Sequence, residues 1–162
     1  MSDHAPAVRF VPGFVGVPGD RTFLLEIDDT GGRVWYLLEK VQVAAFAEQC
    51  ALLLADLGLS GAGKDIDPGP LSEPDDIEFR VGRIGIDYHE ERDLIEITLE
   101  PSAEDAMAVV HAVTPAQLDA AVRLGAAAVA SGRPKCPRCG LAIDPDGHVC
   151  PTTNGDLRDH RP

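Results

Sequence analysis

"RTFLLEIDDTGGRVWYLLEKVQVAAFAEQCALLLADLG", residues 21–58, changes its hydrophobic period halfway along. Residues 21–27 are rich in strand formers and run into the turn signal "DDTGG", so they predict a β-hairpin with residues 33–39. From residue 40 to residue 57, apolar side chains recur at helical spacing, and Gly58 is a natural stop. The stretch therefore predicts two strands followed by an amphipathic helix.

The segments around this stretch repeat the same kinds of signal. Before it, "RFVPGFVGVPGD" (residues 9–20) predicts two short strands broken by Pro-Gly pairs. After it, "IEFRVGRIGIDYHEERDLIEITLEP" (77–101) predicts a second hairpin, and "AMAVVHAV" (106–113) predicts a further strand. "TPAQLDAAVRLGAAAVASG" (114–132) predicts a second helix that begins with an N-cap threonine and a proline.

Strands followed by one helix, twice over, predict an α+β fold with a mostly antiparallel sheet and both helices on one face. Duplication of a strand-strand-strand-helix unit is one interpretation, although the identity between the halves is too low to establish it. "SGAGKDIDPGPLSEPDD" (60–76) is rich in Gly, Pro and acids and predicts a mobile connector inside the domain. We expect an α+β domain over residues 1–131 and a small tail over residues 132–162.

The charge of the chain limits its partners. The 162 residues carry a formal net charge of -13, which disfavours nucleic acid and anionic lipid. The tail (residues 132–162) carries about +1 and the rest of the chain, called the body below, about -14. The negative charge of the body therefore opposes nucleic-acid binding through the basic residues of the tail. No apolar run resembles a secretory signal or reaches the length of a membrane helix. We therefore expect a cytoplasmic protein, in a compartment where thiols stay reduced.

The tail contains the chain's clearest chemical motif. "CPRCGLAIDPDGHVCP" (136–151) holds three of the four cysteines and a histidine. A C-x2-C knuckle directs two thiolates at one ion, and a histidine two positions before a cysteine lies on the same side of an extended segment. The tail has few apolar residues, whereas structural zinc supplies about 10–16 kcal/mol in small zinc-finger peptides. The pattern predicts a structural zinc site with the ligands Cys136, Cys139, His148 and Cys150.

Two other interpretations of the cluster stay open, namely a redox dithiol and a tail without a ligand. The fourth ligand is also open, because His160 or a group from a second protomer could replace His148. Four ligands within fifteen residues, without an H-E-x-x-H motif, favour a closed site that does no chemistry.

A second candidate site is weaker. The Gly-Pro loop "PGFVGVPGDR" (12–21) could cradle an anion beside Arg21, but it lacks the Lys-Ser/Thr of a P-loop. Arg80 and Arg83 lie on the second hairpin, where a solvated sheet face is the simpler interpretation. We also expect Cys50 to be a buried thiol and His111 to be a hydrogen-bonded sheet histidine.

The chain resembles an uncharacterised actinobacterial family, domain of unknown function 3090, over nearly its full length. The resemblance rests on "RFVPGFVGVPGDRTFLLEI" (9–27), "LLEKVQVAAFAE" (37–48), "FRVGRIGIDY" (79–88) and, above all, "CPRCGLAIDPDGHVCPTTNG" (136–155). It implies a single domain with a zinc-knuckle-like tail, in which Pro151, Asn154 and Gly155 complete the motif. It implies no activity.

These patterns favour a zinc-binding protein that is not an enzyme and that binds or regulates a protein partner, or associates with itself. No serine triad or nucleophile elbow can be traced in the chain. The alternative is a protein or enzyme that binds a small anionic ligand through the Gly-Pro loop and the sheet-face arginines Arg21, Arg80 and Arg83.

Overall fold

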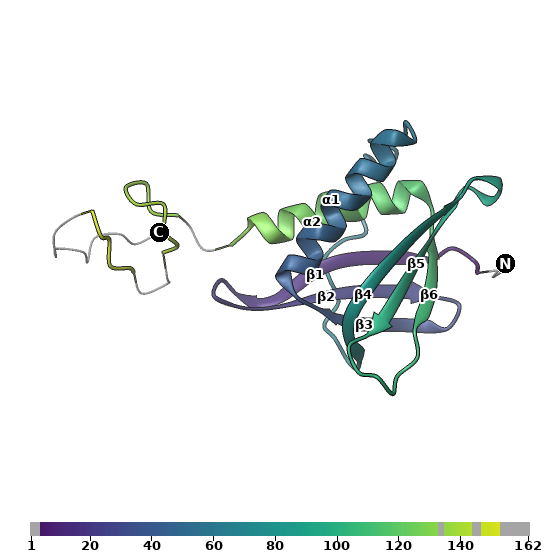
Figure 1. Cartoon of the computed structure of the whole chain (residues 1–162), viewed down its shortest axis with the longest axis horizontal. Helices are drawn as coiled ribbons and strands as arrows, with labels where there is room; N and C mark the ends of the chain where they lie inside the picture. The colour runs from purple at the N-terminus through teal and green to yellow at the C-terminus, as the bar shows by residue number, and fades with distance from the viewer. Residues whose placement is uncertain (1–3, 133–134, 144–146, 153–162) are drawn as a thin grey trace.

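The computed structural model describes residues 4–132, 135–143 and 147–152, which form six strands and two α-helices (Figure 1). A single 3-10 turn over Glu90–Arg92 joins the fourth and fifth strands. In chain order the elements are β1 (Arg9–Val17), β2 (Asp20–Asp29), β3 (Gly32–Leu38), α1 (Lys40–Asp56), β4 (Ile77–His89), β5 (Leu94–Pro101), β6 (Val109–Val113) and α2 (Pro115–Ala130).

The strands form one sheet whose spatial order is the same as their order in the chain. Every neighbouring pair is antiparallel except β3 and β4, which are parallel. A parallel pair needs a long crossover, and α1 together with the connector after it supplies one. The sheet also curves, so that the segment before β1 meets β6. Pro6 bridges Ala112 in β6, and the amide of Ala7 donates to the Ala112 carbonyl at 2.7 Å. The expected α+β fold with a mainly antiparallel sheet is confirmed.

Both helices lie on the same side of the sheet (Figure 1). Helix α2 packs against α1 and against β1. Alternate residues of β2, such as Leu25 and Ile27, are buried in the core with Val43 of α1 and Leu118 of α2. Burial of this apolar surface is the main force that holds the two layers together. Among the described residues, no helix is long and apolar enough to cross a membrane.

Each α-helix begins with a capping box. Thr114 accepts from the amide of Gln117 at 3.1 Å, and the Gln117 side chain accepts from the Thr114 amide at 2.8 Å. Glu39 and Gln42 make the reciprocal arrangement at the start of α1. The caps satisfy amides that have no partner inside the helix, so both helices start where the sequence pattern predicts.

The connector over residues 60–76 has neither helix nor strand, but it is anchored and is not the mobile segment that its composition suggested. The Asp119 carboxylate of α2 accepts from the amides of Gly61 and Gly63, at 2.9 Å each. A Cβ on Gly63 would lie only 2.0 Å from the Ala116 carbonyl oxygen, so a side chain is excluded at that position. Composition reports local flexibility, whereas these contacts come from a helix more than fifty residues away.

A buried carboxylate holds the far end of the connector. Glu26 of β2 is 0 % exposed and points away from the helices, because its neighbours in the strand point toward them. Its carboxylate accepts from Arg9 Nε at 2.5 Å and from the amide of Ser72 at 2.6 Å. Arg9 also donates to the carbonyls of Pro68 and Pro70. The connector therefore covers part of the face of the sheet that the helices leave open, beside β1 and β2.

Candidate functional site

The first half of the cysteine cluster is a tight loop. Lys135 pairs with Ala142, and the amide of Cys136 donates to the Leu141 carbonyl at 2.8 Å. The amide of Gly140 donates back to the Cys136 carbonyl at 2.9 Å, and Gly140 has a φ of 75°, which glycine adopts without strain. This turn brings the two thiols of the C-x2-C motif together.

The second half of the cluster completes a four-atom arrangement. The ligand atoms of Cys136, Cys139, His148 and Cys150 all lie within 4.8 Å of one another. Cys136 Sγ is 3.9 Å from Cys150 Sγ, and Cys139 Sγ is 3.9 Å from His148 Nε2. In a tetrahedron with Zn–S bonds of about 2.3 Å, neighbouring sulfurs lie about 3.8 Å apart. The four side chains are therefore close enough together to hold a metal ion.

The surroundings of the thiols affect their protonation. Cys136 and Cys150 are 2 % and 0 % exposed. The Thr152 hydroxyl lies 3.0 Å from Cys150 Sγ, and its hydrogen bond lowers the pKa of Cys150 to about 7. Burial raises the pKa of Cys139 above its ordinary value. A metal binds the thiolate, so the hydrogen bond at Cys150 favours the form that a metal requires.

The four predicted ligands are thus brought together by the fold. The alternative ligand His160 lies outside the described residues, as do Asn154 and Gly155 of the family motif. Asp144, Pro145 and Asp146, between the two halves of the cluster, lie outside them as well.

A comparison with protein families identifies the family of the chain. The profile of the family "Protein of unknown function (DUF3090)" matches residues 3–150. The chain belongs to the DUF3090 family. The match to DUF3090 includes all four Cys and His residues of the cluster. No curated protein and no solved structure matches the chain significantly.

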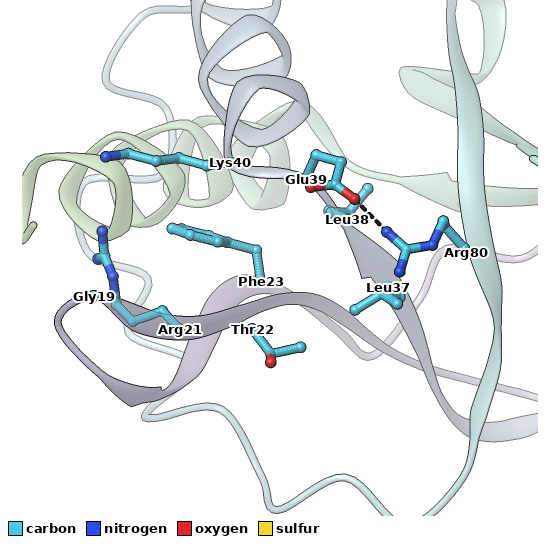
Figure 2. A pocket seen from close by; sticks show the side chains of 9 residues that line it. All are labelled: Gly19, Arg21, Thr22, Phe23, Leu37, Leu38, Glu39, Lys40 and Arg80. Atoms are coloured by element: carbon cyan, nitrogen blue, oxygen red, sulfur yellow. Dashed lines mark hydrogen bonds and ion pairs between the residues drawn. The ribbon is translucent and has the colours of Figure 1, made fainter.

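A second site is a pocket of about 390 Å³ at the start of α1 (Figure 2). Two of the three predicted anion-binding arginines, Arg21 and Arg80, line it together. The third, Arg83, lines a different pocket and pairs with Glu100 at 3.0 Å. The remaining residues of the first pocket come from the turn between β1 and β2, from β2, from β3 and from the N-cap and first residue of α1. They are Gly19, Thr22, Phe23, Leu37, Leu38, Glu39 and Lys40.

The Gly-Pro loop is not an open cradle. β1 continues through Pro12 and Gly13 and pairs with β2 along its whole length, so the chain turns only at Pro18 and Gly19. Gly16 has a φ of 98°, and a Cβ there would lie 2.3 Å from the Asp20 carbonyl oxygen. The glycines serve a tight hairpin, and only Gly19 of this segment lines the pocket beside Arg21.

The prediction that His111 is a hydrogen-bonded sheet histidine is confirmed, but its two partners were not predicted. His111 Nδ1 lies 2.8 Å from Asp29 Oδ2, and His111 Nε2 lies 2.7 Å from the hydroxyl of Tyr36. Burial, with the charges of Glu78 and Asp29, raises the pKa of Tyr36 and keeps the phenol neutral. Strands far apart in sequence meet here, so no local pattern could identify these partners.

Proposed function

We propose that the protein is a zinc-binding module without enzymatic activity, in which a structural zinc orders the C-terminal segment for binding to a protein partner. One observation carries this proposal. Four potential ligand atoms lie within 4.8 Å of one another in a segment whose described core consists of Cys136, Ile143 and Cys150. So small an apolar core stabilises little by itself, and a bound metal would supply the missing free energy.

The donor set favours zinc. Three thiolates and one imidazole suit Zn²⁺, whereas calcium and magnesium prefer oxygen ligands. Most iron–sulfur clusters take four cysteines, and the fourth cysteine of this chain, Cys50, is buried in the core of the other region. Burial raises the pKa of Cys50 to about 12, which also removes it as a competing ligand.

The same donor set favours a structural role. A catalytic zinc keeps three protein ligands and an open position for water or substrate. Here the four side chains would fill all four positions of a tetrahedral ion. A closed site of this kind holds the chain in place and does no chemistry on a substrate.

The metal-binding segment presents apolar side chains that a partner could cover. Leu141 is 53 % exposed and Val149 is 75 % exposed. Residues 132–162 carry about +1, against about -14 on the rest of the chain. A weakly charged surface with exposed apolar groups suits a protein, which is either another chain or a second copy of this one, better than a nucleic acid.

Metal analysis of the purified full chain, beside Cys136→Ser, tests the proposal. We expect one zinc per chain in the parent and loss of zinc in the variant. Cys50→Ser is the matched control, since it removes a thiol that lies outside the cluster, and it should keep its zinc. A metal-free parent that is fully folded, with Cys136 and Cys139 reacting rapidly with a thiol reagent, would overturn the proposal in favour of a redox dithiol.

The partner is tested by photo-crosslinking from position 149. A specific adduct should form at this position, disappear on chelation and disappear in Leu141→Ser. A crosslinker at Val17, which is 61 % exposed on the hairpin of β1 and β2, is the control and should not give that adduct. An adduct that survives chelation would show that binding does not depend on the metal-held structure.

A further inference from the structure

The cationic pocket is unusual in so acidic a chain. The sequence has 27 acidic and 14 basic residues, and most arginines of the body face a carboxylate, such as Arg9 on Glu26 and Arg33 on Asp28. Three cations line this pocket, but of the described carboxylates only Glu39 does so. Like charges gathered in this way repel one another unless an anion lies between them.

Two of the three cations have no carboxylate partner in the part of the chain that the structure describes. Neither Arg21 nor Lys40 forms an ion pair within residues 4–132, 135–143 and 147–152. The two groups also converge, because a Cβ on Gly132 would lie 3.5 Å from Arg21 Nη2 and 3.7 Å from Lys40 Nζ. Figure 2 shows both side chains on the same side of the pocket, across from Arg80.

Arg21 is held in position before any ligand arrives. Its Nη1 donates to the Ala128 carbonyl at 2.9 Å and to Ser131 Oγ at 3.3 Å. Its guanidinium carbon lies 4.7 Å from the ring centre of Phe14 and 5.0 Å from that of Phe23. Such preorganisation reduces the entropy lost when a ligand binds.

Support of the end of α2 explains only part of this arrangement. A cation near a helix C-terminus is favourable, and Arg21 meets that need through Nη1 alone. Its Nε and Nη2 make no hydrogen bond with the described residues, and Lys40 Nζ makes none either. Three donor groups therefore remain to bind an anion.

The opposite side of the pocket offers a different chemistry. Arg80 pairs with Glu39, and the two side chains are 51 % and 58 % exposed. An ion pair this exposed contributes about 0–1 kcal/mol, so a ligand can replace it at little cost. Glu39 would then accept a hydrogen bond from a ligand hydroxyl, while Arg80 would add a third cation.

We propose that this pocket binds the phosphate monoester of a small hydroxylated molecule, with the phosphate between Arg21 and Lys40 and a hydroxyl group on Glu39. A phosphate monoester carries nearly two negative charges at neutral pH and so matches two unpaired cations, whereas a carboxylate carries one. A pocket of about 390 Å³ has the size of a small-molecule site. This site is separate from the cysteine cluster, and its function does not depend on the metal.

Calorimetric titration of the full chain with glucose 6-phosphate tests the proposal, with glucose, inorganic sulfate and citrate as comparison ligands. We expect glucose 6-phosphate to bind more tightly than the other three. Lys40→Gln and Arg80→Gln should each weaken binding roughly tenfold or more, since each removes a charged hydrogen bond. Arg83→Gln is the matched control on the same strand as Arg80 and should leave the affinity unchanged.

Three results would overturn the proposal. The first is no binding of glucose 6-phosphate at millimolar concentration. The second is equal binding of citrate or sulfate, which would mean that the pocket does not recognise a phosphate monoester. The third is an equal loss of affinity in Arg83→Gln, which would mean that binding of the anion depends only on the overall charge of the protein. Protein treated with a chelator should still bind glucose 6-phosphate. Failure of the phosphate proposal can therefore be distinguished from failure of the zinc proposal.

Discussion

The two regions of this chain obtain their order in different ways. The region built from the sheet and the two helices buries nineteen core residues in one cluster. Among its described residues the cysteine segment buries three in its core, and two of them are the proposed ligands Cys136 and Cys150. Hydrophobic burial is spread over many contacts, whereas a metal centre depends on each of its four ligands. The same chain is therefore expected to respond to different perturbations at its two ends.

Metal removal should separate the two regions most clearly. Chelation should remove about 10–16 kcal/mol of binding free energy from the cysteine segment and leave the sheet and helices folded. Hydrogen exchange followed by mass spectrometry measures both regions at once. Amides such as that of Cys136 should lose protection, while those of β2 and β5 should keep it. Simultaneous loss of protection in both regions would show that they fold as one unit.

The largest single-residue effect in the body is expected at Glu26. Glu26→Gln leaves Arg9, whose side chain is only 15 % exposed, without its charged partner. Breaking a buried pair in this way costs about 3–5 kcal/mol of the free energy of unfolding, measured by urea denaturation. Asp28→Asn is the control, because its 2.9 Å pair with Arg33 is more exposed and should cost about 0–1 kcal/mol. Zinc content should be unchanged in both variants.

Asp119→Ala should release the connector from α2. The amides of Gly61 and Gly63 would lose their acceptor, at a cost of about 1–3 kcal/mol. Limited proteolysis should then cut residues 60–66 faster than in the parent. Asp67→Ala is the matched control. Among the described residues Asp67 accepts only from Gly69, in its own turn, so its loss should change stability by less than about 0.5 kcal/mol. Equal cleavage of the two variants would contradict the anchored connector.

Low pH should destabilise the region of the sheet and helices through the carboxylate of Glu26. Burial alone would raise the pKa of Glu26, but hydrogen bonds from Arg9 and Ser72 outweigh it and hold the pKa below the ordinary value of 4.5. Because the pKa is lowered in the folded state, this stabilisation is complete above pH 4.5 and is lost as the pH falls through the lowered pKa. Urea unfolding of the parent should show this loss, and Glu26→Gln should lack that part of it.

The smallest effect is expected at Cys50. Burial raises the pKa of this thiol to about 12, so it should not react with iodoacetamide in the native protein. Chelation should expose the three cysteines of the tail to alkylation and leave Cys50 unlabelled, as peptide mass spectrometry would show. Labelling of Cys50 at the same rate as the tail would mean that the core opens with the metal site.

Features set by short-range interactions were predicted from the sequence, whereas features set by contacts between distant segments were not. The hairpin and helix of residues 21–58 were predicted nearly as they form, because turn signals and apolar periods act over a few residues. The parallel pairing of β3 with β4 and the contact of Pro6 with β6 were not, because both join distant segments. The connector was judged by composition alone, so its bonds to Asp119 and Glu26 were missed.

The two candidate sites differ in the same respect, since one is set by local spacing and the other by contacts between distant segments. The sequence by itself determined the four members of the cysteine cluster, because fifteen residues hold them all and local turns bring them together. Only the tertiary structure decided that Arg21 and Arg80 share a pocket, that Lys40 joins them and that Arg83 does not. Those residues lie on different strands and at a helix start, and their distances depend on how the sheet curves around the helices. The physical reason is that spacing along a chain sets local geometry, whereas packing of the whole core sets the rest.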